Sequence, residues 1–487
     1  MEHSDERDIR IQKAETLAKH GVDPYPNIAE RTHTCSAAES LFDDLSSSGT
    51  SVTLVGRVRS IRRHGGSTFC VIQDAHARFQ VFLRRDTLGD EQYMQMKDFL
   101  DMGDFLQAKG TLFLTKTEEK TLHATSVRIL TKAFLPLPEQ WHGLSDMEMR
   151  YRRRYLDLIV NESVRDIFEK RACIVRAFRE FLEKDGFMEV ETPILQSIPG
   201  GALARPFVTH HHALDEDMYL RIAPELFLKR LIIGGFERVY EFARCFRNEG
   251  IDHSHNPEFT QVEGYMAYAD YTALMDMVER MLFTVVEQVH KESFFEYRNT
   301  RIDMTPPYQR KTFRDSVFEA TGIDIETHTP AELKYRVRAQ GIGADETDTT
   351  AHILDLLFKN SIKTITQPTF IIDAPLELLP LAKKKKNTQT VESVQLIIAG
   401  MEILKGFSEL NDPIDQAQRF EDQQKQREQG DEEAHWIDSE YVTALEYGLP
   451  PTAGFGIGID RFTALLTNSG SLKEVMLFPT LRSKDIK

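Results

Sequence analysis

Short runs of alternating apolar and polar residues, separated by turns, fill most of residues 52–132. A period of two is typical of strands that bury one face and expose the other. The runs are VTLVGRVRSI, TFCVIQD, RFQVFLRRD, FLQAKGTLFLT and LHATSVRILT. This pattern predicts five strands that close into a small β-barrel.

The predicted barrel has the size of an OB fold, whose open face commonly binds single-stranded nucleic acid. Phe69 and Arg62 lie on its strands and could offer a stacking ring and a cation to bases. From the strand pattern alone, a place for Phe69 inside the barrel core is the better expectation.

The pattern changes after FLPLPEQWHGLSD, which is predicted to be a linker because of its prolines and glycine. Residues 163–186 then show helical spacing, and further helices and strands alternate toward the C-terminus. We expect an α+β protein with an N-terminal helix and barrel in residues 1–135, a linker in 136–150 and a larger domain in 151–487.

Residues 239–267 are predicted to form paired strands with an unusual mixed face. In the first run, Arg247 and Glu249 share one face. In the second run, one face carries Phe259, Gln261, Glu263 and Tyr265. Aromatic and charged residues together on a covered sheet indicate a pocket, whereas an edge hairpin with a solvated face is the alternative. The stretch alone favours neither.

The composition fits a globular protein of two or more domains, with 487 residues, 41% of them hydrophobic and 28% charged. The net charge of −16 does not indicate nucleic-acid binding, although arginines cluster in residues 57–63 and 150–155. No apolar run is long enough to span a membrane, and the charged start is unlike a signal peptide. Four scattered cysteines favour reduced thiols in the cytoplasm over a zinc site.

Alternating glycines mark residues 447–466, where Gly454, Gly456 and Gly458 precede Arg461. Glycines at this spacing in a strand let a ligand or another backbone approach closely. The spacing is not GxGxxG, and GxxxxGK[ST] does not occur in the sequence. Any nucleotide would therefore bind without either common glycine-rich loop.

Three stretches resemble the motifs of the class II aminoacyl-tRNA synthetases: GFMEVETPIL (186–195) is similar to motif 1, FRNEG with HNPEFT (246–260) to motif 2, and GIGIDR (456–461) to motif 3. RIAPELFLKRLIIGGFERVYE and GFSELNDPIDQAQRF resemble the lysyl-tRNA synthetases more closely. The resemblance covers about residues 50–480. It implies an antiparallel sheet flanked by helices behind the OB-type barrel, and a homodimer formed through motif 1.

The resemblance implies that ATP activates lysine to lysyl-adenylate and that lysine then passes to the 3′ end of tRNA(Lys). Arg247 and Arg461 would be catalytic, because arginine forks match phosphate oxygens and stay charged. The residues implied for ATP binding are Arg247, Glu249, His255, Asn256, Phe259, Glu402 and Arg461. Without the resemblance, His255 is better explained as a turn residue.

The resemblance also implies a lysine pocket, in which carboxylates compensate the buried ammonium. Its implied residues are Gly201, Glu225, Arg247, Glu263, Tyr265, Lys405, Phe407 and Glu409. Arg62, Phe69 and Gln80 match the family's anticodon-binding pattern.

Three positions depart from the family pattern. Gln395 replaces the first of two glutamates, the second being Glu402, that help to hold Mg²⁺, so the number of ions is open. Lys405 stands in place of an asparagine, and could pair with a substrate carboxylate or phosphate, or repel lysine. Ser126 replaces a glutamate that faces the anticodon.

These departures keep a second hypothesis open, a synthetase-like relative that binds RNA or nucleotide without efficient aminoacylation. A relative that uses aspartate or asparagine is disfavoured, because two carboxylates in the pocket would repel an acidic side chain. An enzyme that attaches lysine to a protein is disfavoured by the anticodon-binding domain.

Overall fold

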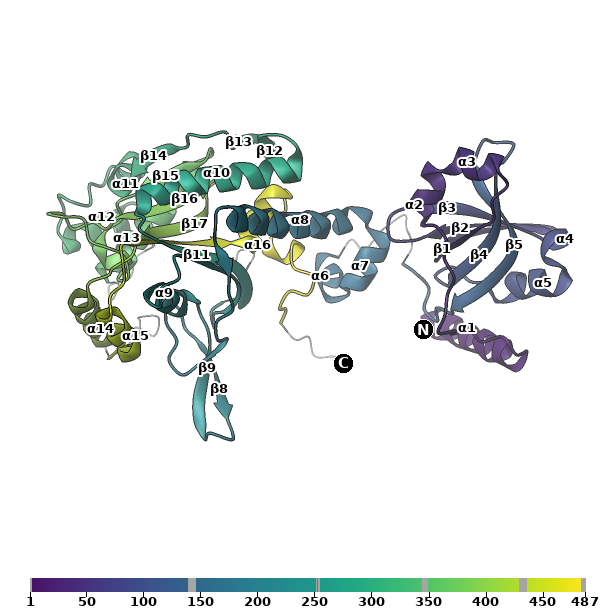
Figure 1. Ribbon diagram of the computed structural model, residues 1–487, viewed down its shortest axis with the longest axis horizontal. Coiled ribbons are helices and arrows are strands. Elements are labelled where there is room, and N and C mark those ends of the chain that lie inside the picture. Colours follow the sequence, from purple (N-terminus) through teal and green to yellow (C-terminus); the bar gives the residue numbers. More distant parts are fainter. Residues whose placement is uncertain are drawn as a thin grey trace. The chain divides into compact units, whose positions relative to one another are not determined.

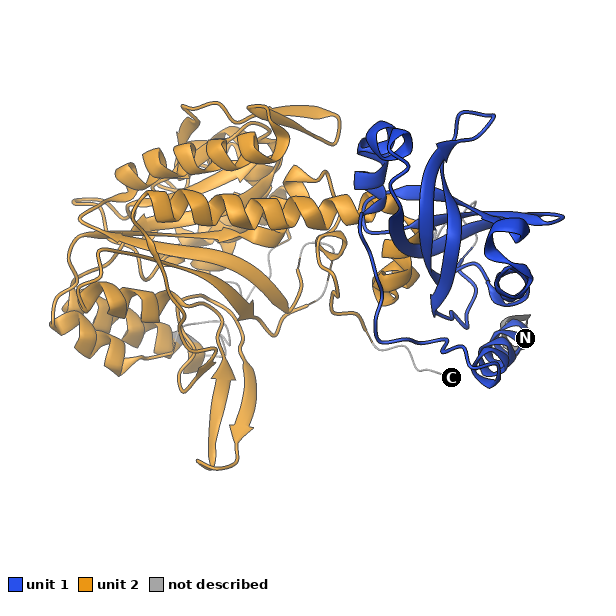
Figure 2. Ribbon diagram, turned by 45° about the vertical axis from the view of Figure 1, so that its right-hand side comes forward, with its two compact units in different colours: residues 1–144 blue, residues 145–487 orange. Residues whose placement is uncertain are grey.

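The computed structural model describes residues 2–138, 146–250, 252, 255–343, 349–428 and 436–482. The chain divides into two compact units, Met1–Leu144 and Ser145–Lys487 (Figure 2). Residues 139–145 of the predicted linker lie outside the described residues.

The first unit is built on a closed barrel of strand order β1-β2-β3-β5-β4. Its strands are β1 (Val52–His64), β2 (Ser67–Gln73), β3 (Arg78–Arg84), β4 (Phe105–Leu114) and β5 (Lys120–Thr131). Its helices are α1 (Glu2–Lys19), α2 (Cys35–Ser40), α3 (Phe42–Ser47), α4 (Arg85–Leu88) and α5 (Asp90–Phe99). Alternate strand residues such as Cys70, Ile72 and Val81 are fully buried inside the barrel, which confirms the prediction of five strands.

The second unit is built on an eight-stranded sheet of order β14-β15-β16-β17-β18-β11-β10-β6 (Figure 1). The strands are β6 (Met188–Glu189), β10 (Arg238–Phe246), β11 (Glu258–Ala267), β14 (Gln309–Thr312), β15 (Thr369–Ile372), β16 (Ser393–Ile398), β17 (Met401–Ser408) and β18 (Thr452–Gly458). Neighbouring strands are antiparallel except at the two ends, β14–β15 and β10–β6. The α+β fold class is thereby confirmed. The edge-hairpin alternative is wrong, because β10 and β11 are interior strands.

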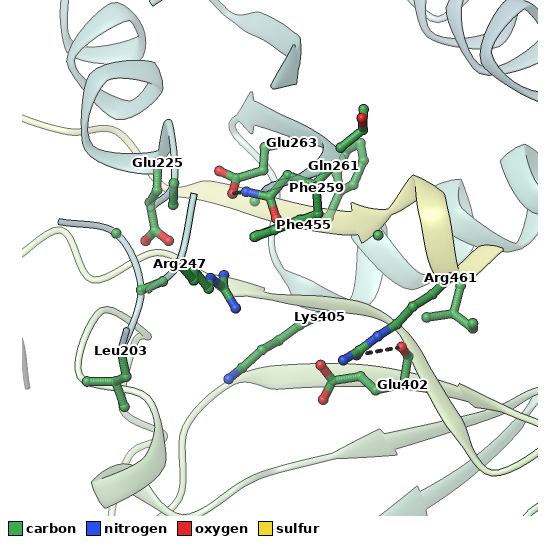
Figure 3. Close-up of a pocket in the computed structure, with 18 of the residues that line it drawn as sticks. Leu203, Glu225, Arg247, Phe259, Gln261, Glu263, Glu402, Lys405, Phe455 and Arg461 are labelled. Atoms are coloured by element: carbon green, nitrogen blue, oxygen red, sulfur yellow. Dashed lines mark hydrogen bonds between the residues drawn. The ribbon is translucent and has the colours of Figure 1, made fainter. Parts of the chain in front are cut away.

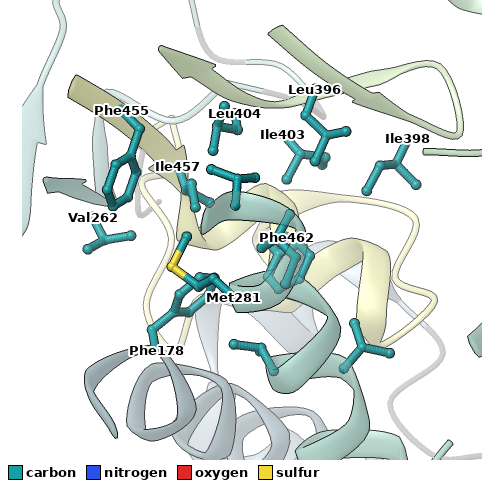
Figure 4. Packing of buried hydrophobic residues seen from close by; sticks show 14 of the residues in the cluster. Phe178, Val262, Met281, Leu396, Ile398, Ile403, Leu404, Phe455, Ile457 and Phe462 are labelled. Atoms are coloured by element: carbon teal, nitrogen blue, oxygen red, sulfur yellow. The ribbon is translucent and has the colours of Figure 1, made fainter. Parts of the chain in front are cut away.

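One face of this sheet packs on three helices, α8 (Glu162–Lys184), α10 (Tyr271–His290) and α16 (Ile459–Leu466). Figure 4 shows the interface, in which Phe178, Met281 and Phe462 from the helices meet Val262 and Ile457 from the strands. Because strand residues alternate between faces, this core takes the even positions of β11 and the odd positions of β18. The odd positions of β11 and the even positions of β18 therefore point to the other face of the sheet.

The other face is only partly covered. On the β15–β16 side lie α11 (Phe313–Thr321), α12 (Pro330–Ala339) and α13 (Thr350–Ser361), and on the β10–β11 side lie α9 (Glu225–Ile233), α14 (Pro413–Glu428) and α15 (Ser439–Glu446). These groups bury separate apolar clusters. The strands between them keep an open face.

The remaining described elements lie around this framework. They are α6 (Met147–Arg152), α7 (Arg154–Val160), β7 (Leu195–Gln196), β8 (Phe207–His211), β9 (Glu216–Leu220), β12 (Phe294–Tyr297), β13 (Thr300–Asp303) and three short 3₁₀ turns, η1 (Ile362–Thr364), η2 (Leu376–Leu378) and η3 (Leu472–Glu474). Arg154 of the arginine cluster is buried, with Asp157 and the carbonyl oxygens of residues 473, 476 and 477 as its partners, so it anchors the C-terminal segment.

Candidate active site

The open face of the sheet holds a cavity of about 320 Å³. Its floor is β18, where Gly454, Gly456 and Gly458 face the cavity in place of side chains. Each glycine pairs with a residue of β11 that lines the cavity, and the register sets Gly454 opposite Tyr265 and Gly456 opposite Glu263. The glycines therefore open space between the side chains of the flanking strands, as their spacing predicted.

The residues predicted for lysine and ATP all line this single cavity. They are Gly201, Glu225, Arg247, Glu249, His255, Asn256, Phe259, Glu263, Tyr265, Glu402, Lys405, Phe407, Glu409 and Arg461. They come from the loop between β7 and β8, from α9, from the loop between β10 and β11, from β11, from β17 and the residue after it, and from α16. The pocket interpretation of the mixed strand face is therefore confirmed, while the individual roles stay predictions.

A β-bulge brings Glu402 to the cavity. Gln395 pairs with Lys405 across β16 and β17, but Ile397 pairs with Glu402, so Ile403 is an extra residue. Without this bulge Glu402, three residues from Lys405, would point to the opposite face. Gln395 itself is not among the lining residues; its Nε2 donates to Glu402 Oε2 at 2.6 Å.

One end of the cavity is acidic and deeply buried. Glu225, Glu263 and Glu409 are 7%, 6% and 2% exposed. Between them lies Lys229, which the sequence pattern did not single out; its Nζ lies 2.5 Å from Glu225 Oε1 and forms an ion pair with Glu409. Lys229 is fully buried. Its position four residues after Glu225 on a helix was the available signal.

Aromatic rings surround the Lys229 ammonium. Its Nζ lies 5.5 Å from the ring centroid of Phe407, 5.9 Å from Tyr441 and 6.0 Å from Tyr265. Burial alone would lower the pKa of Lys229, but the carboxylates of Glu225 and Glu409 outweigh it and raise the pKa. Lys229 is therefore a charged counter-ion within the fold.

Glu263 is held by neighbours on its own strand. Its Oε1 accepts from Gln261 Nε2 at 2.6 Å and its Oε2 from the Tyr265 hydroxyl at 3.2 Å. Burial, with Glu225 adding to it, raises the pKa of Glu263 to about 8. Burial likewise raises the pKa of Glu409 well above its usual range, and Glu409 Oε1 has no hydrogen-bond donor among the described residues. Glu263 has no ion pair among the described residues that would offset its burial, whereas Glu409 has Lys229.

The other end of the cavity is cationic. In Figure 3, Lys405 and Arg461 lie on the side away from Glu225 and Glu263, with Arg247 between the two sets. Arg247 Cζ stands 4.9 Å from the ring centroid of Phe259, and its buried Nε has no hydrogen-bond partner in the part of the chain described. Arg461 Nη1 donates to the Glu402 backbone oxygen at 3.5 Å. This end can receive an anion.

The rim carries the remaining predicted ATP residues. His255 and Glu249 are exposed, and the His255 ring lies beside the Asp252 carboxylate at 2.9 Å. Asn256 bridges two segments: its Nδ2 donates to the Glu258 carbonyl oxygen at 2.6 Å, and its Oδ1 accepts from the Thr480 N–H at 3.2 Å. Asn256 thus ties the loop before β11 to the C-terminal segment.

The barrel presents a separate polar and aromatic surface. Arg62, Phe69, Phe82 and His123 are successive partners across β1, β2, β3 and β5. Phe69 is half-buried and stacks on Phe82, with ring centroids 4.5 Å apart. It is therefore not a core residue, and the core expectation was wrong, because Cys70 and Ile72 of the opposite parity fill the core.

Polar contacts complete this barrel surface. Arg62 Nη2 donates to Gln80 Oε1 at 2.9 Å, and Gln80 Nε2 donates to Thr121 Oγ1 at 2.8 Å. Ser126 is exposed, next to Lys109 in the β4–β5 register. The sequence pattern did not single out Phe82 and His123, although Phe82 shares the parity of Gln80 on β3.

The fold and cavity define a class II aminoacyl-tRNA synthetase, in which an antiparallel sheet carries the site and an OB barrel accompanies it. Residues 146–482 match the family model of tRNA synthetases class II (D, K and N), and residues 52–130 match that of the OB-fold nucleic acid binding domain.

Named relatives are similar along the whole chain. The lysine–tRNA ligase of Pelotomaculum thermopropionicum is 46% identical over 98% of this chain and 95% of its own length. That of Clostridium novyi is 47% identical over 97% and 94%, and that of Roseiflexus castenholzii 46% over the full length of both. The chain belongs to the lysine–tRNA ligase family, whose members use ATP. None of the helices that the structure describes is long and apolar enough to cross a membrane.

Proposed function

We propose that this cavity joins lysine to ATP, giving lysyl-adenylate and pyrophosphate, and that the enzyme then transfers lysine to tRNA(Lys). The observation that carries this proposal is the division of charge in the cavity. Three buried carboxylates face one resident ammonium, that of Lys229, at the acidic end. The two ammonium groups of a bound lysine molecule would keep the other two carboxyl groups ionised and balance their charge.

The proposed arrangement follows from this balance. Glu225, Glu409 and the Tyr265 hydroxyl receive the side-chain ammonium, with Phe407 along its methylene stem, and Glu263 with the Gly201 backbone holds the α-ammonium. The carboxylate of lysine then points toward Arg247. An uncharged amino acid would leave the carboxylates unpaired, so this end selects against it.

ATP is proposed to occupy the cationic end. Phe259 stacks on adenine, with Glu249, His255 and Asn256 around the nucleotide. Arg247 contacts the α-phosphate and Arg461 the far end of the triphosphate. A carboxylate oxygen of lysine attacks the α-phosphorus in line as the bond to the β-phosphate oxygen breaks, so the residues act by positioning and charge rather than by proton transfer.

Mg²⁺ fits the described residues only in part. Glu402 is the carboxylate that Gln395 contacts, and no three His, Cys, Asp or Glu residues in the described ranges are grouped to hold a metal. Because Mg²⁺ commonly binds through one or two carboxylates together with substrate phosphates, we propose that it arrives on ATP. Glu402 would be its main protein contact and Gln395 at most a weak one. The ion supplies neutralisation of phosphate charge.

The test is lysine-dependent ATP–pyrophosphate exchange with the full chain. We expect exchange with lysine and none with leucine, glutamine or aspartate. A folded protein that binds ATP and tRNA but shows no exchange at any Mg²⁺ concentration would contradict the proposal. It would favour the synthetase-like relative that only binds RNA or nucleotide.

We further propose that the barrel reads the anticodon through Arg62, Phe69 and Gln80. The half-buried ring of Phe69, and the Arg62–Gln80 contact beside it, support this role. Stacking on one base contributes about 1–3 kcal/mol. Phe69→Ala should therefore raise the KM for tRNA about tenfold or more and leave lysine-dependent exchange unchanged.

We also propose a homodimer through motif 1 and a cytoplasmic location. Met188, Ile194 and Leu195 of motif 1 are 44%, 43% and 44% exposed, and such apolar clusters mark interaction surfaces. Light scattering should give twice the mass of one chain. The four cysteines, all described, are free thiols, as in proteins of a reducing compartment.

A further inference from the structure

Lys405 is a cavity residue whose charge has no counterpart in the described protein. It lies on β17, half-buried, and lines the cavity. Across the sheet it pairs with Gln395 on one side and with Gly456 on the other. Neither neighbour can neutralise it, and within the described ranges it has no ion pair, hydrogen bond or ring contact.

The whole cationic end shares this imbalance. Arg247 and Arg461 also lack a carboxylate partner among the described residues. Arg461 contacts only the backbone oxygen of Glu402, whose carboxylate turns Oε2 to Gln395. Charges that are withdrawn from water without a partner cost free energy, so such a group indicates an anionic ligand that supplies the partner.

The sheet register fixes where that anion lies. Lys405, Gly456 and Glu263 form one row across β17, β18 and β11. Strands lie about 4.8 Å apart, so Lys405 and Glu263 flank a gap of about 10 Å above a glycine. When Glu263 holds the α-ammonium of an amino acid, its carboxylate occupies the same row, on the side of Lys405. The long, flexible stem of Lys405 can carry its ammonium to that carboxylate and to the phosphate it attacks.

The metal ligands are correspondingly few. The amide of Gln395 adds no charge, and it donates to Glu402 instead of leaving both Glu402 oxygens to an ion. A site in which Glu402 is engaged by an amide and lies among Arg247, Lys405 and Arg461 attracts a second divalent ion less than a site with two free carboxylates.

We propose that Lys405 binds the reacting anions, the amino-acid carboxylate and the α-phosphate, and takes over charge neutralisation that a second Mg²⁺ would otherwise supply. This inference rests on the proposed function. The new bond joins a carboxylate oxygen to the α-phosphorus, the bond to the β-phosphate oxygen breaks, and pyrophosphate leaves with the electron pair. Lys405 remains protonated throughout, so its contribution is positional and electrostatic.

The first test measures binding without turnover. Lysinol adenylate keeps the phosphate and both amines of lysyl-adenylate but has no acyl carbonyl. Its affinity for the full-length protein is measured by calorimetry in excess chelator. We expect binding without divalent ions, an affinity at least tenfold weaker for Lys405→Met, and near wild-type affinity for Lys405→Arg. Equal affinities of wild type and Lys405→Met would overturn the inference.

The second test is a double-mutant comparison in lysine-dependent exchange, with Mg²⁺ titrated. Lys405→Met should lower kcat about 100-fold, in the range found when one charge-stabilising donor is removed, and should raise the Mg²⁺ concentration for half-maximal rate. Adding Gln395→Glu to Lys405→Met should restore part of the rate at high Mg²⁺, with Gln395→Glu alone assayed as the second single variant. An unaltered Mg²⁺ requirement in Lys405→Met would contradict the inference.

The two tests separate this inference from the proposed function. Absence of wild-type exchange, with lysinol adenylate still bound through Lys405, would refute catalysis and retain the anion site. Absence of both binding and exchange would refute both.

Discussion

The two ends of the cavity respond differently to an absent ligand. At the acidic end, Lys229 compensates part of the negative charge, and the raised pKa of Glu263 lets this residue hold a proton that an ammonium would displace. At the cationic end, arginines cannot release their protons near neutral pH. Arg247 and Arg461 therefore stay charged without carboxylate partners in the described chain.

This difference shows which part of the site belongs to the fold. The Lys229 ion pairs join α9 to the segment after β17, so the acidic end contributes to the cohesion of the unit. The cationic end makes few contacts within the protein. Bound anions offset the free-energy cost of keeping these cations partly buried without a partner. The residues of the cationic end should therefore affect binding and rate more than folding.

The largest expected effect follows from removal of the resident cation at the acidic end. Lys229→Met leaves Glu225 and Glu409 buried without their cation, and removal of one partner of a buried ion pair costs about 3–5 kcal/mol. Lys405→Met is the matched control, because the same substitution removes a cation without a protein partner and should change stability by less than about 0.5 kcal/mol. Urea unfolding at fixed protein concentration measures both. Equal losses would mean that the two ends do not differ.

The next largest effect is expected when side chains are added to the glycines of the cavity floor, between the two ends. A Cβ at Gly454 would clash with Glu409 Oε1 and the Tyr265 ring, whereas one at Gly456 would meet Glu263 Cγ at an ordinary 3.5 Å. Overpacking costs about 1–3 kcal/mol, so Gly454→Ala should raise the KM for lysine about 10- to 100-fold. Gly456→Ala should raise it less. The ratio of the two KM values in exchange assays checks the geometry, and a ratio near one would contradict it.

Local pattern was sufficient for most of the fold and part of the site. The period of two gave the barrel strands, and on β11 it put Glu263 and Tyr265 together on the face opposite Val262. These predictions succeeded because strand parity is a local property of the backbone. Their assignment to lysine and ATP depended on motif resemblance, because parity alone does not name a ligand.

The features that escaped prediction arise from contacts between distant segments. Lys229 resembles a solvated helix residue until Glu409, 180 residues later by their numbers, closes over it. The bulge at Ile403 reverses the parity that would have sent Glu402 to the apolar core. Phe69 was mistaken for core because the strand pattern does not show which parity faces into a barrel.

The smallest expected effect is a release of protons from the acidic end when lysine binds. With a pKa of about 8, Glu263 is mostly protonated at pH 6–7 in the empty cavity. The α-ammonium of lysine favours its ionised form, so binding releases a proton. Affinity for lysine should therefore rise with pH, by close to tenfold per unit at most, and level off near the pKa of Glu263. Calorimetry of lysine binding at pH 7, in buffers of different ionisation heat, should detect the release.

Glu263→Gln is the control for this proton release. It keeps the shape of the side chain and its place beside Gln261 and Tyr265, but has no titrating group, so the rise in affinity between pH 6 and 8 should largely disappear. If wild type and Glu263→Gln release the same number of protons, the acidic end is already ionised when empty. The acidic end would then differ from the cationic end only because it contains its own counter-ion, Lys229.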